Sequence, residues 1–181
     1  MTGGRRRWRV GLLGAGVLVA AASALIPGCA NPREDYSPEQ PIAYSHKLHA
    51  GELAIDCRYC HVEVDSGRHA SIPSTAICMN CHSGVGKDKD GVIKLTAYYD
   101  NQRSIPWVKV HDLPDFVYFD HSRHLKKGFE CERCHDKVEE MERVRTVQPL
   151  NMGWCVGCHR KPEHPDEPEL VGPTDCHICH R

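Results

Sequence analysis

Ten of the 11 cysteines in this chain lie in five copies of one short motif, Cys-Xaa-Xaa-Cys-His. The copies occupy positions 57–61, 78–82, 131–135, 155–159 and 176–180, and they are numbered motifs 1 to 5 in chain order. Two thiols at this spacing can form thioethers with both vinyl groups of one porphyrin, and the histidine that follows then lies beneath the iron. The motifs therefore predict five covalently attached c-type haems.

The residues that would hold these haems follow directly from the motif. Thioether bonds are expected from Cys57, Cys60, Cys78, Cys81, Cys131, Cys134, Cys155, Cys158, Cys176 and Cys179. Proximal iron ligands are expected from His61, His82, His135, His159 and His180. Paired cysteines also build zinc sites and disulfide frameworks, but neither of these needs a histidine after every second cysteine.

Each iron would need a second, distal ligand, and eight further histidines are available. Four of them form two His-Xaa-Xaa-His pairs, His46 with His49 and His121 with His124. In both pairs an aromatic residue stands two positions before the first histidine, and six or seven residues separate the second histidine from a haem motif. Residues three apart share a helix face, so one helical turn could carry ligands for two irons. These four histidines are the main distal candidates.

The fifth distal position is open to three further residues. His69, within "GRHASIP", and His111, within "VHDLPD", compete for it, and each is almost as easily explained as a histidine in a loop. Met141 could replace a histidine, although a methionine more often fills a gap in packing. The choice matters because methionine–histidine ligation raises the reduction potential of a haem.

The repeated order of these elements indicates a duplicated two-haem module. One unit covers 44–82, the second covers 119–159, and the fifth motif stands alone at 176–180. The chain is poor in large aliphatic residues, so five porphyrins would have to supply most of its core. We therefore expect a mostly irregular multihaem cytochrome c fold with short α-helices, wrapped around five haems. Each motif should begin a helical turn, and the segment 137–144 is the best independent helix.

The first residues have the pattern of an export signal. A basic run from Arg5 to Arg9 precedes an apolar stretch that ends at Cys29, in a sequence similar to a bacterial lipobox. We expect 1–28 to be a lipoprotein-type signal peptide, Cys29 to carry the lipid, 29–43 to be a tether and 44–181 to be the haem domain. An uncleaved N-terminal helix and simple cleavage are the alternatives. All three place the haems on the periplasmic side of a bacterial membrane.

The distribution of charge argues against a nucleic-acid partner. The net charge of the whole chain is −1, and the predicted signal peptide contains four arginines and no acidic residue. Without that peptide the net charge falls to about −5. Haem propionates would make the domain more acidic still, and an acidic surface repels phosphate backbones.

Several runs of the chain resemble the pentahaem cytochrome subunit of alternative complex III, a bacterial quinol-oxidising respiratory complex. In order between residues 40 and 181, they are "PIAYSHKLHAGELAIDCRYCH", "HASIPSTAICMNCHSG", "PWVKVHDLPDFVYFDHSRHLKKGFECERCH", "PLNMGWCVGCHR" and "GPTDCHICHR". The two His-Xaa-Xaa-His units also resemble the wider cytochrome c3/c7 group. The resemblance implies partners in the form of quinol-oxidising membrane subunits, an iron–sulfur protein, and a monohaem cytochrome or terminal oxidase. It also favours His69, His111 and Met141 as ligands.

These features favour one of three classes of function. We expect an electron-transfer subunit of a membrane-associated respiratory complex, with no catalytic residues of its own. The alternative is a free-standing periplasmic shuttle or metal reductase of the c3/c7 kind, which would purify alone. A multihaem enzyme would need an iron with a coordination position free for substrate, and the surplus of histidines argues against that reading.

Overall fold

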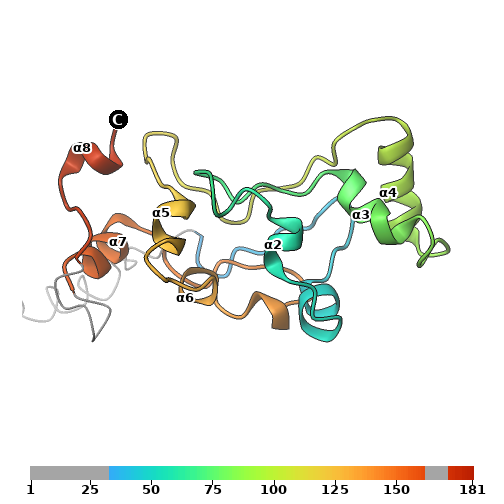
Figure 1. Cartoon of the computed structure of the whole chain (residues 1–181), viewed down its shortest axis with the longest axis horizontal. Helices are drawn as coiled ribbons and strands as arrows, with labels where there is room; N and C mark the ends of the chain where they lie inside the picture. Colours follow the sequence, from blue (N-terminus) through green and yellow to red (C-terminus); the bar gives the residue numbers. More distant parts are fainter. Residues whose placement is uncertain (1–32, 162–170) are drawn as a thin grey trace, which may run out of the picture. The chain divides into compact units, whose positions relative to one another are not determined.

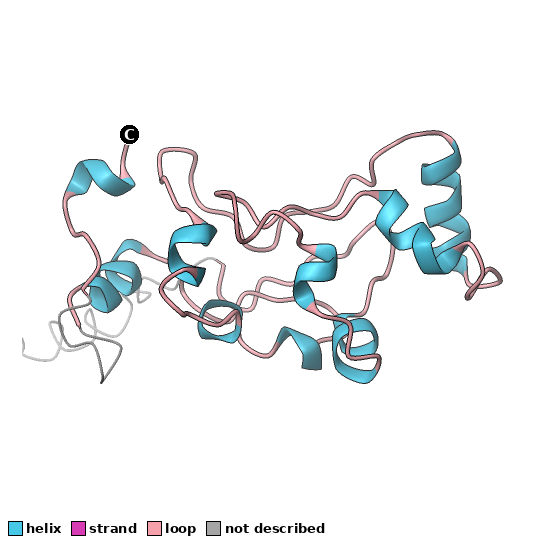
Figure 2. Ribbon diagram, in the orientation of Figure 1, coloured by secondary structure: helices cyan, strands magenta, loops and turns pink. Residues whose placement is uncertain are grey.

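Short helices joined by long irregular segments make up the described part of the chain (Figure 2). The computed structural model describes residues 33–161 and 171–181, which belong to a unit that spans Pro32–Arg181. The signal peptide expected at 1–28 and the lipidation site expected at Cys29 lie outside the described residues. None of the helices in the described ranges is both long and apolar enough to cross a membrane.

The helices follow one another as shown in Figure 1. In chain order they are the π-helix η2 (Lys47–Glu52), α2 (Cys57–Cys60), α3 (Thr75–His82), α4 (Asp90–Asp100), α5 (His121–Leu125), α6 (Glu132–His135), the 3-10 turn η3 (Val138–Glu140), α7 (Met152–His159) and α8 (Cys176–Cys179). Within 33–161 and 171–181 there is no β-sheet, and an isolated antiparallel bridge joins Val117 to His180. The predicted fold class, mostly irregular with short helices, is confirmed.

Every haem motif forms a helical turn, as the sequence predicted. Helices α2, α6 and α8 are single turns within motifs 1, 3 and 5, whereas α3 and α7 begin three residues before motifs 2 and 4. Two of these turns are capped by side chains. Asp56 accepts from the backbone N–H of Arg58 at 2.7 Å, and Asn151 accepts from that of Trp154 at 2.9 Å. A helical turn places the two cysteines of a motif on one face, which suits two bonds to one porphyrin.

The expected helix at 137–144 is wrong in extent. Only Val138–Glu140 is helical, as a 3-10 turn, and Met141 already has an extended backbone with φ −96° and ψ 121°. The backbone N–H of Lys47 donates to the carbonyl of Met141 at 3.0 Å, and η2 packs against η3. Tertiary contact with η2 therefore overrides the helix propensity of the glutamate-rich segment.

The longest described helix, α4, was not predicted, and it contributes two of the five buried hydrophobic residues of the described chain. Val92 and Leu95 are buried on one side of it, whereas Ile93 is 54% exposed. Leu95 packs with Ile42 and Ile105 in a cluster that also contacts the partly buried Cys78, Met79, Tyr98 and Trp107. The apolar core of the described chain is therefore small, and it lies against motif 2.

The described part of the expected tether, 33–43, is hydrogen-bonded to later parts of the chain. The backbones of Asp35 and Tyr36 exchange bonds with Thr146, which is only 2% exposed. Further along, the amide side chain of Gln40 both donates to and accepts from the backbone of Val108, at 2.9 Å each. These bonds hold residues 35–40 beside the segments that precede motifs 3 and 4.

The small core generates a test of stability. Replacing Leu95 by Ala should destabilise the haem-loaded protein by about 3 kcal/mol, because it removes a buried side chain where two helices meet. Thermal or chemical unfolding followed by circular dichroism measures the change. The matched variant Ile93→Ala, on the exposed side of the same helix, should change the free energy of unfolding by less than about 0.5 kcal/mol. Equal effects of the two variants would contradict the assignment of Leu95 to the core.

Candidate functional site

Three of the motif histidines are oriented by hydrogen bonds to backbone carbonyl oxygens. Nδ1 of His61 donates to the carbonyl of Ser71 at 2.7 Å, and Nδ1 of His159 donates to the carbonyl of Pro173 at 2.7 Å. Nδ1 of His82 donates in the same way, at 3.0 Å, to the carbonyl three residues further along the chain. A carbonyl oxygen can only accept, so the proton lies on Nδ1 and the Nε2 lone pair is free to bind a metal.

The same kind of bond holds three of the four histidines in the His-Xaa-Xaa-His pairs. Nδ1 of His49 and Nδ1 of His124 each donate at 2.9 Å to the carbonyl four residues earlier, within their own helical turns. Nδ1 of His121 donates to the carbonyl of Arg68 at 2.7 Å, which comes from the first module. These side chains also present Nε2 for coordination.

Three of these rings face a motif histidine at nearly the same separation. The pairs and the distances between their ring centres are His49–His82 at 6.1 Å, His124–His159 at 6.0 Å and His121–His135 at 6.3 Å. Metal–imidazole bonds are about 2 Å long, so two imidazoles on opposite sides of one metal ion have ring centres about 6 Å apart. Each pair therefore has the spacing of two axial ligands of a single iron.

The fourth histidine of the pairs, His46, lies beside motif 1. Burial, and then the neighbouring His61 and His49, lower the pKa of His46 to about 4. Its Nδ1 is buried and has no hydrogen-bond partner in the described part of the chain. The ring of Tyr44 stacks on His49 and meets His46 edge-on, at 4.5 and 4.9 Å between ring centres. The aromatic residue that precedes the pair thus fixes both imidazoles.

The side chain of His135, in motif 3, lies at the centre of a cluster of imidazoles. Burial, and then His111, His121 and His61 in that order, lower the pKa of His135 to about 3. Burial and the charge of His121 also lower the pKa of His111. The imidazoles are therefore neutral, and the neutral ring is the form that binds iron.

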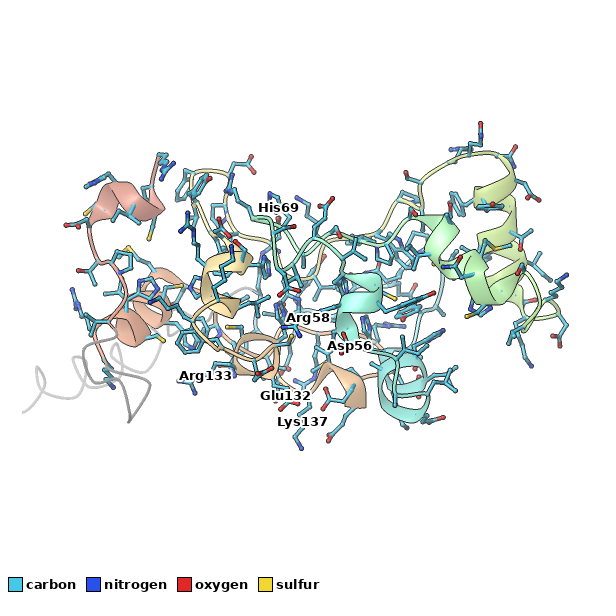
Figure 3. All side chains as sticks on the ribbon, in the orientation of Figure 1. Asp56, Arg58, His69, Glu132, Arg133 and Lys137 are labelled. Atoms are coloured by element: carbon cyan, nitrogen blue, oxygen red, sulfur yellow. The ribbon has the colours of Figure 1, made fainter. Side chains whose placement is uncertain are left out.

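Among the described residues, the remaining distal candidates show no ring pair with a motif histidine at about 6 Å. The ring of His111 lies edge-on to His135 at 4.4 Å, which is too close for two ligands on opposite sides of one iron, and its Nε2 is buried without a hydrogen-bond partner in the described residues. His69 is exposed on the loop labelled in Figure 3. Met141 lies where η3 meets η2, with its carbonyl bonded to Lys47.

The ring that faces His180 of motif 5 belongs to Phe116, at 5.8 Å between ring centres. The neighbouring Tyr118 donates its backbone N–H to the carbonyl of Cys179 at 2.6 Å. The Tyr118 ring also contacts two guanidinium groups, that of Arg68 at 3.5 Å and that of Arg181 at 4.3 Å. Sequence reasoning did not assign this cluster, although the aromatic run before the second His-Xaa-Xaa-His pair was a signal for it.

The donor set fits c-type haem better than a zinc ribbon. None of the ten described cysteines is paired in a disulfide, so both thiols of each motif are available to a porphyrin. Among residues 33–161 and 171–181, no three Cys, His, Asp or Glu side chains gather into a group that could hold a metal ion. Three motif histidines are instead each paired with one other imidazole, and a porphyrin would supply the other four ligands that an iron needs.

Comparison with known proteins agrees with this geometry. The sequence profile described as cytochrome c7 and related cytochrome c matches residues 117–181. The multiheme cytochrome c subunit of menaquinone reductase from Nitratidesulfovibrio vulgaris is 30% identical over 168 residues, covering 79% of this chain and 77% of the relative. The high-molecular-weight cytochrome c of the same organism is 27% identical over 164 residues, covering 89% of this chain but only 20% of that protein.

The fold, the five cysteine pairs and the paired imidazoles define a multihaem cytochrome c. More narrowly, the chain belongs to the multihaem cytochrome c3/c7 family, with distant homology to the menaquinone reductase subunit. Membership implies several c-type haems and an electron carrier rather than a catalytic enzyme.

The contact between Gly172 and His159 gives a test of the site. A Cβ built at Gly172 would lie between 2.5 and 2.8 Å from three ring atoms of His159, so the variant Gly172→Ala must displace that ring. We expect the electron paramagnetic resonance signal of one low-spin haem to shift and its reduction potential to change. In the control Gly84→Ala, the nearest atom lies at 3.9 Å, and the spectrum should be unchanged. An unaltered spectrum in Gly172→Ala would refute the contact.

Proposed function

We propose that the irons of motifs 1 to 4 each have two imidazole ligands. The proposed distal ligands of motifs 1, 2, 3 and 4 are His46, His49, His121 and His124, respectively. Three ring pairs at 6.0–6.3 Å support the assignments at motifs 2, 3 and 4, and they are the observation that carries the proposal. The enclosure of His46 beside His61 supports the assignment at motif 1.

The chain would act as a carrier of electrons. When bound, each haem supplies an iron that alternates between the ferrous and ferric states. The paired imidazoles would exclude water from both faces of the iron, and the carbonyl bonds to Nδ1 would hold the rings in one orientation. The motif cysteines would fix the porphyrins to helical turns. None of these roles requires a catalytic acid, base or nucleophile.

We propose further that this carrier is a subunit of a membrane-associated respiratory complex that oxidises quinol. Homology to the cytochrome subunit of a menaquinone reductase supports membership of a complex. The resemblance to alternative complex III supports the direction of electron flow, from quinol to the haems. Its partners would be quinol-oxidising membrane subunits, an iron–sulfur protein, and a monohaem cytochrome or terminal oxidase. A signal peptide at 1–28 with a lipid on Cys29, or an uncleaved helix, would hold the domain at 44–181 on the periplasmic side.

Mild detergent extraction tests membership of a complex. The chain should leave the membrane together with integral membrane subunits, which native electrophoresis with haem staining and mass spectrometry would identify. The mass of the chain itself should include five porphyrins. Recovery as a lone protein from the aqueous fraction would favour the free-standing shuttle instead.

The name of the menaquinone reductase relative suggests a second candidate function, in which electrons flow from the haems toward quinone. The relative is described as a subunit of a menaquinone reductase, so the same five-haem path could deliver electrons to the membrane. Stopped-flow mixing of the purified complex with a reduced menaquinol analogue distinguishes the two directions. Fast reduction of the haems supports quinol oxidation. If the oxidised analogue instead oxidises the reduced haems, and the menaquinol analogue does not reduce the oxidised haems, the result would support quinone reduction.

The ligand assignments predict a change of spin state. The variant His124→Ala should convert one haem from low spin to high spin and allow that haem to bind carbon monoxide when reduced, because one axial ligand is lost. Electron paramagnetic resonance and the carbon monoxide difference spectrum measure both effects. The control His69→Ala removes an exposed histidine and should leave the spectra unchanged. A low-spin signal that persists in full in His124→Ala would refute the assignment.

A further inference from the structure

Contacts between the motifs do not follow their order along the chain. Resting on the proposed electron-transfer function, we propose that the five haem attachment sites are arranged in space in the order 2–1–3–4–5. An electron from site 2 then passes to site 1 and jumps directly to site 3 in the second module. Figure 1 shows the helices that carry the motifs in the same succession, α3, α2, α6, α7 and α8.

Sites 1 and 2 are joined within the first module. The side-chain amide of Asn80, inside motif 2, donates to the hydroxyl of Tyr59, inside motif 1, at 3.0 Å. Helix η2 contacts both sites, because the carbonyl of His49 accepts from the backbone N–H of Ile55, two residues before motif 1, while the His49 ring pairs with His82 of motif 2. One short segment therefore fixes the separation of these two sites.

Sites 1 and 3 are joined by the loop 67–71, which ends seven residues before motif 2. The carbonyl of Ser71 accepts from Nδ1 of His61 at 2.7 Å, and the carbonyl of Arg68 accepts from Nδ1 of His121 at 2.7 Å. The backbone N–H groups of His121 and Ser122 also donate to this loop, to the carbonyls of Arg68 and Gly67. The loop thus orients one imidazole at site 1 and one at site 3.

Sites 3, 4 and 5 continue in chain order. Helix α5 carries His121, which pairs with motif 3, and His124, which pairs with motif 4. The ring of His159 then bonds to the carbonyl of Pro173, three residues before motif 5. The aromatic segment just before α5 is also hydrogen-bonded to motif 5, through the Tyr118 backbone.

This order assigns the two ends of the path. Site 2 lies at one end, where the core cluster beneath α4 contacts Cys78 and Met79. Site 5 lies at the other end, where the last residue of the chain, Arg181, contacts Tyr118. An electron donor and an electron acceptor that meet the chain at its ends would therefore approach α4 and the C-terminal segment, with site 3 in the middle.

Proton NMR of the full-length, fully reduced holoprotein in detergent tests the order. Each porphyrin is assigned through nuclear Overhauser effects to its own two cysteines, and effects between porphyrins then identify neighbours. We expect effects between porphyrins 1 and 3, and none between porphyrins 2 and 3. Effects between 2 and 3, or the absence of effects between 1 and 3, would overturn the order. Neither result bears on co-purification with membrane subunits, so the proposed function is judged separately.

Substitution at Ser71 provides a second measurement. Ser71 has a left-handed backbone, with φ 60°, which proline cannot adopt and glycine adopts freely. Ser71→Pro should shift the potentials and low-spin signals of two haems, those of sites 1 and 3, whereas Ser71→Gly should leave both in place. Shifts at sites 1 and 2 with site 3 unchanged would contradict the order, since the loop would then connect consecutive motifs. The glycine variant controls for loss of the serine side chain.

Discussion

The structure depends on a hydrogen bond from Nδ1 of histidine to a backbone carbonyl oxygen. Within residues 33–161 and 171–181, six histidines make this bond, three in haem motifs and three in the His-Xaa-Xaa-His pairs. Each bond fixes the tautomer and the direction of the ring, so that Nε2 is presented to a metal without further rearrangement. Because some of the carbonyls belong to distant segments, the same bonds also hold the irregular chain together.

This constraint explains how a chain with so little core can have a defined structure. In the described part of the chain, the buried apolar cluster consists of Ile42, Leu95 and Ile105, and Val92 and Val64 are buried outside it. Ordering long loops costs conformational entropy that such a core could not offset. The proposed ligation of each iron by two imidazoles from different segments would close several loops at once, as metal binding does in small zinc domains. The haems and the loops should therefore become ordered together.

The two His-Xaa-Xaa-His turns are built alike. In the proposed ligand set each turn would supply ligands to two motifs, and the aromatic residue before it, Tyr44 or Phe119, packs against both rings. The two copies are not identical, because the first turn is a π-helix and the second is α-helical. The loop 67–71 of the first copy is bonded to the turn of the second, so the modules are coupled through backbone carbonyls rather than through an apolar interface.

The spacing of residues close together in the chain predicted much of the haem attachment in this protein. The five motifs and the helical turn at each could be read from the sequence, because covalent attachment requires residues a fixed distance apart. The sequence could not say which histidine faces which motif, or find the ring of Phe116 beside His180, since both depend on residues far apart in the chain. It also misplaced a helix at 137–144 and missed α4. Only the tertiary structure decided which loop carbonyl meets which imidazole, because that choice depends on how the loops close and not on local propensity.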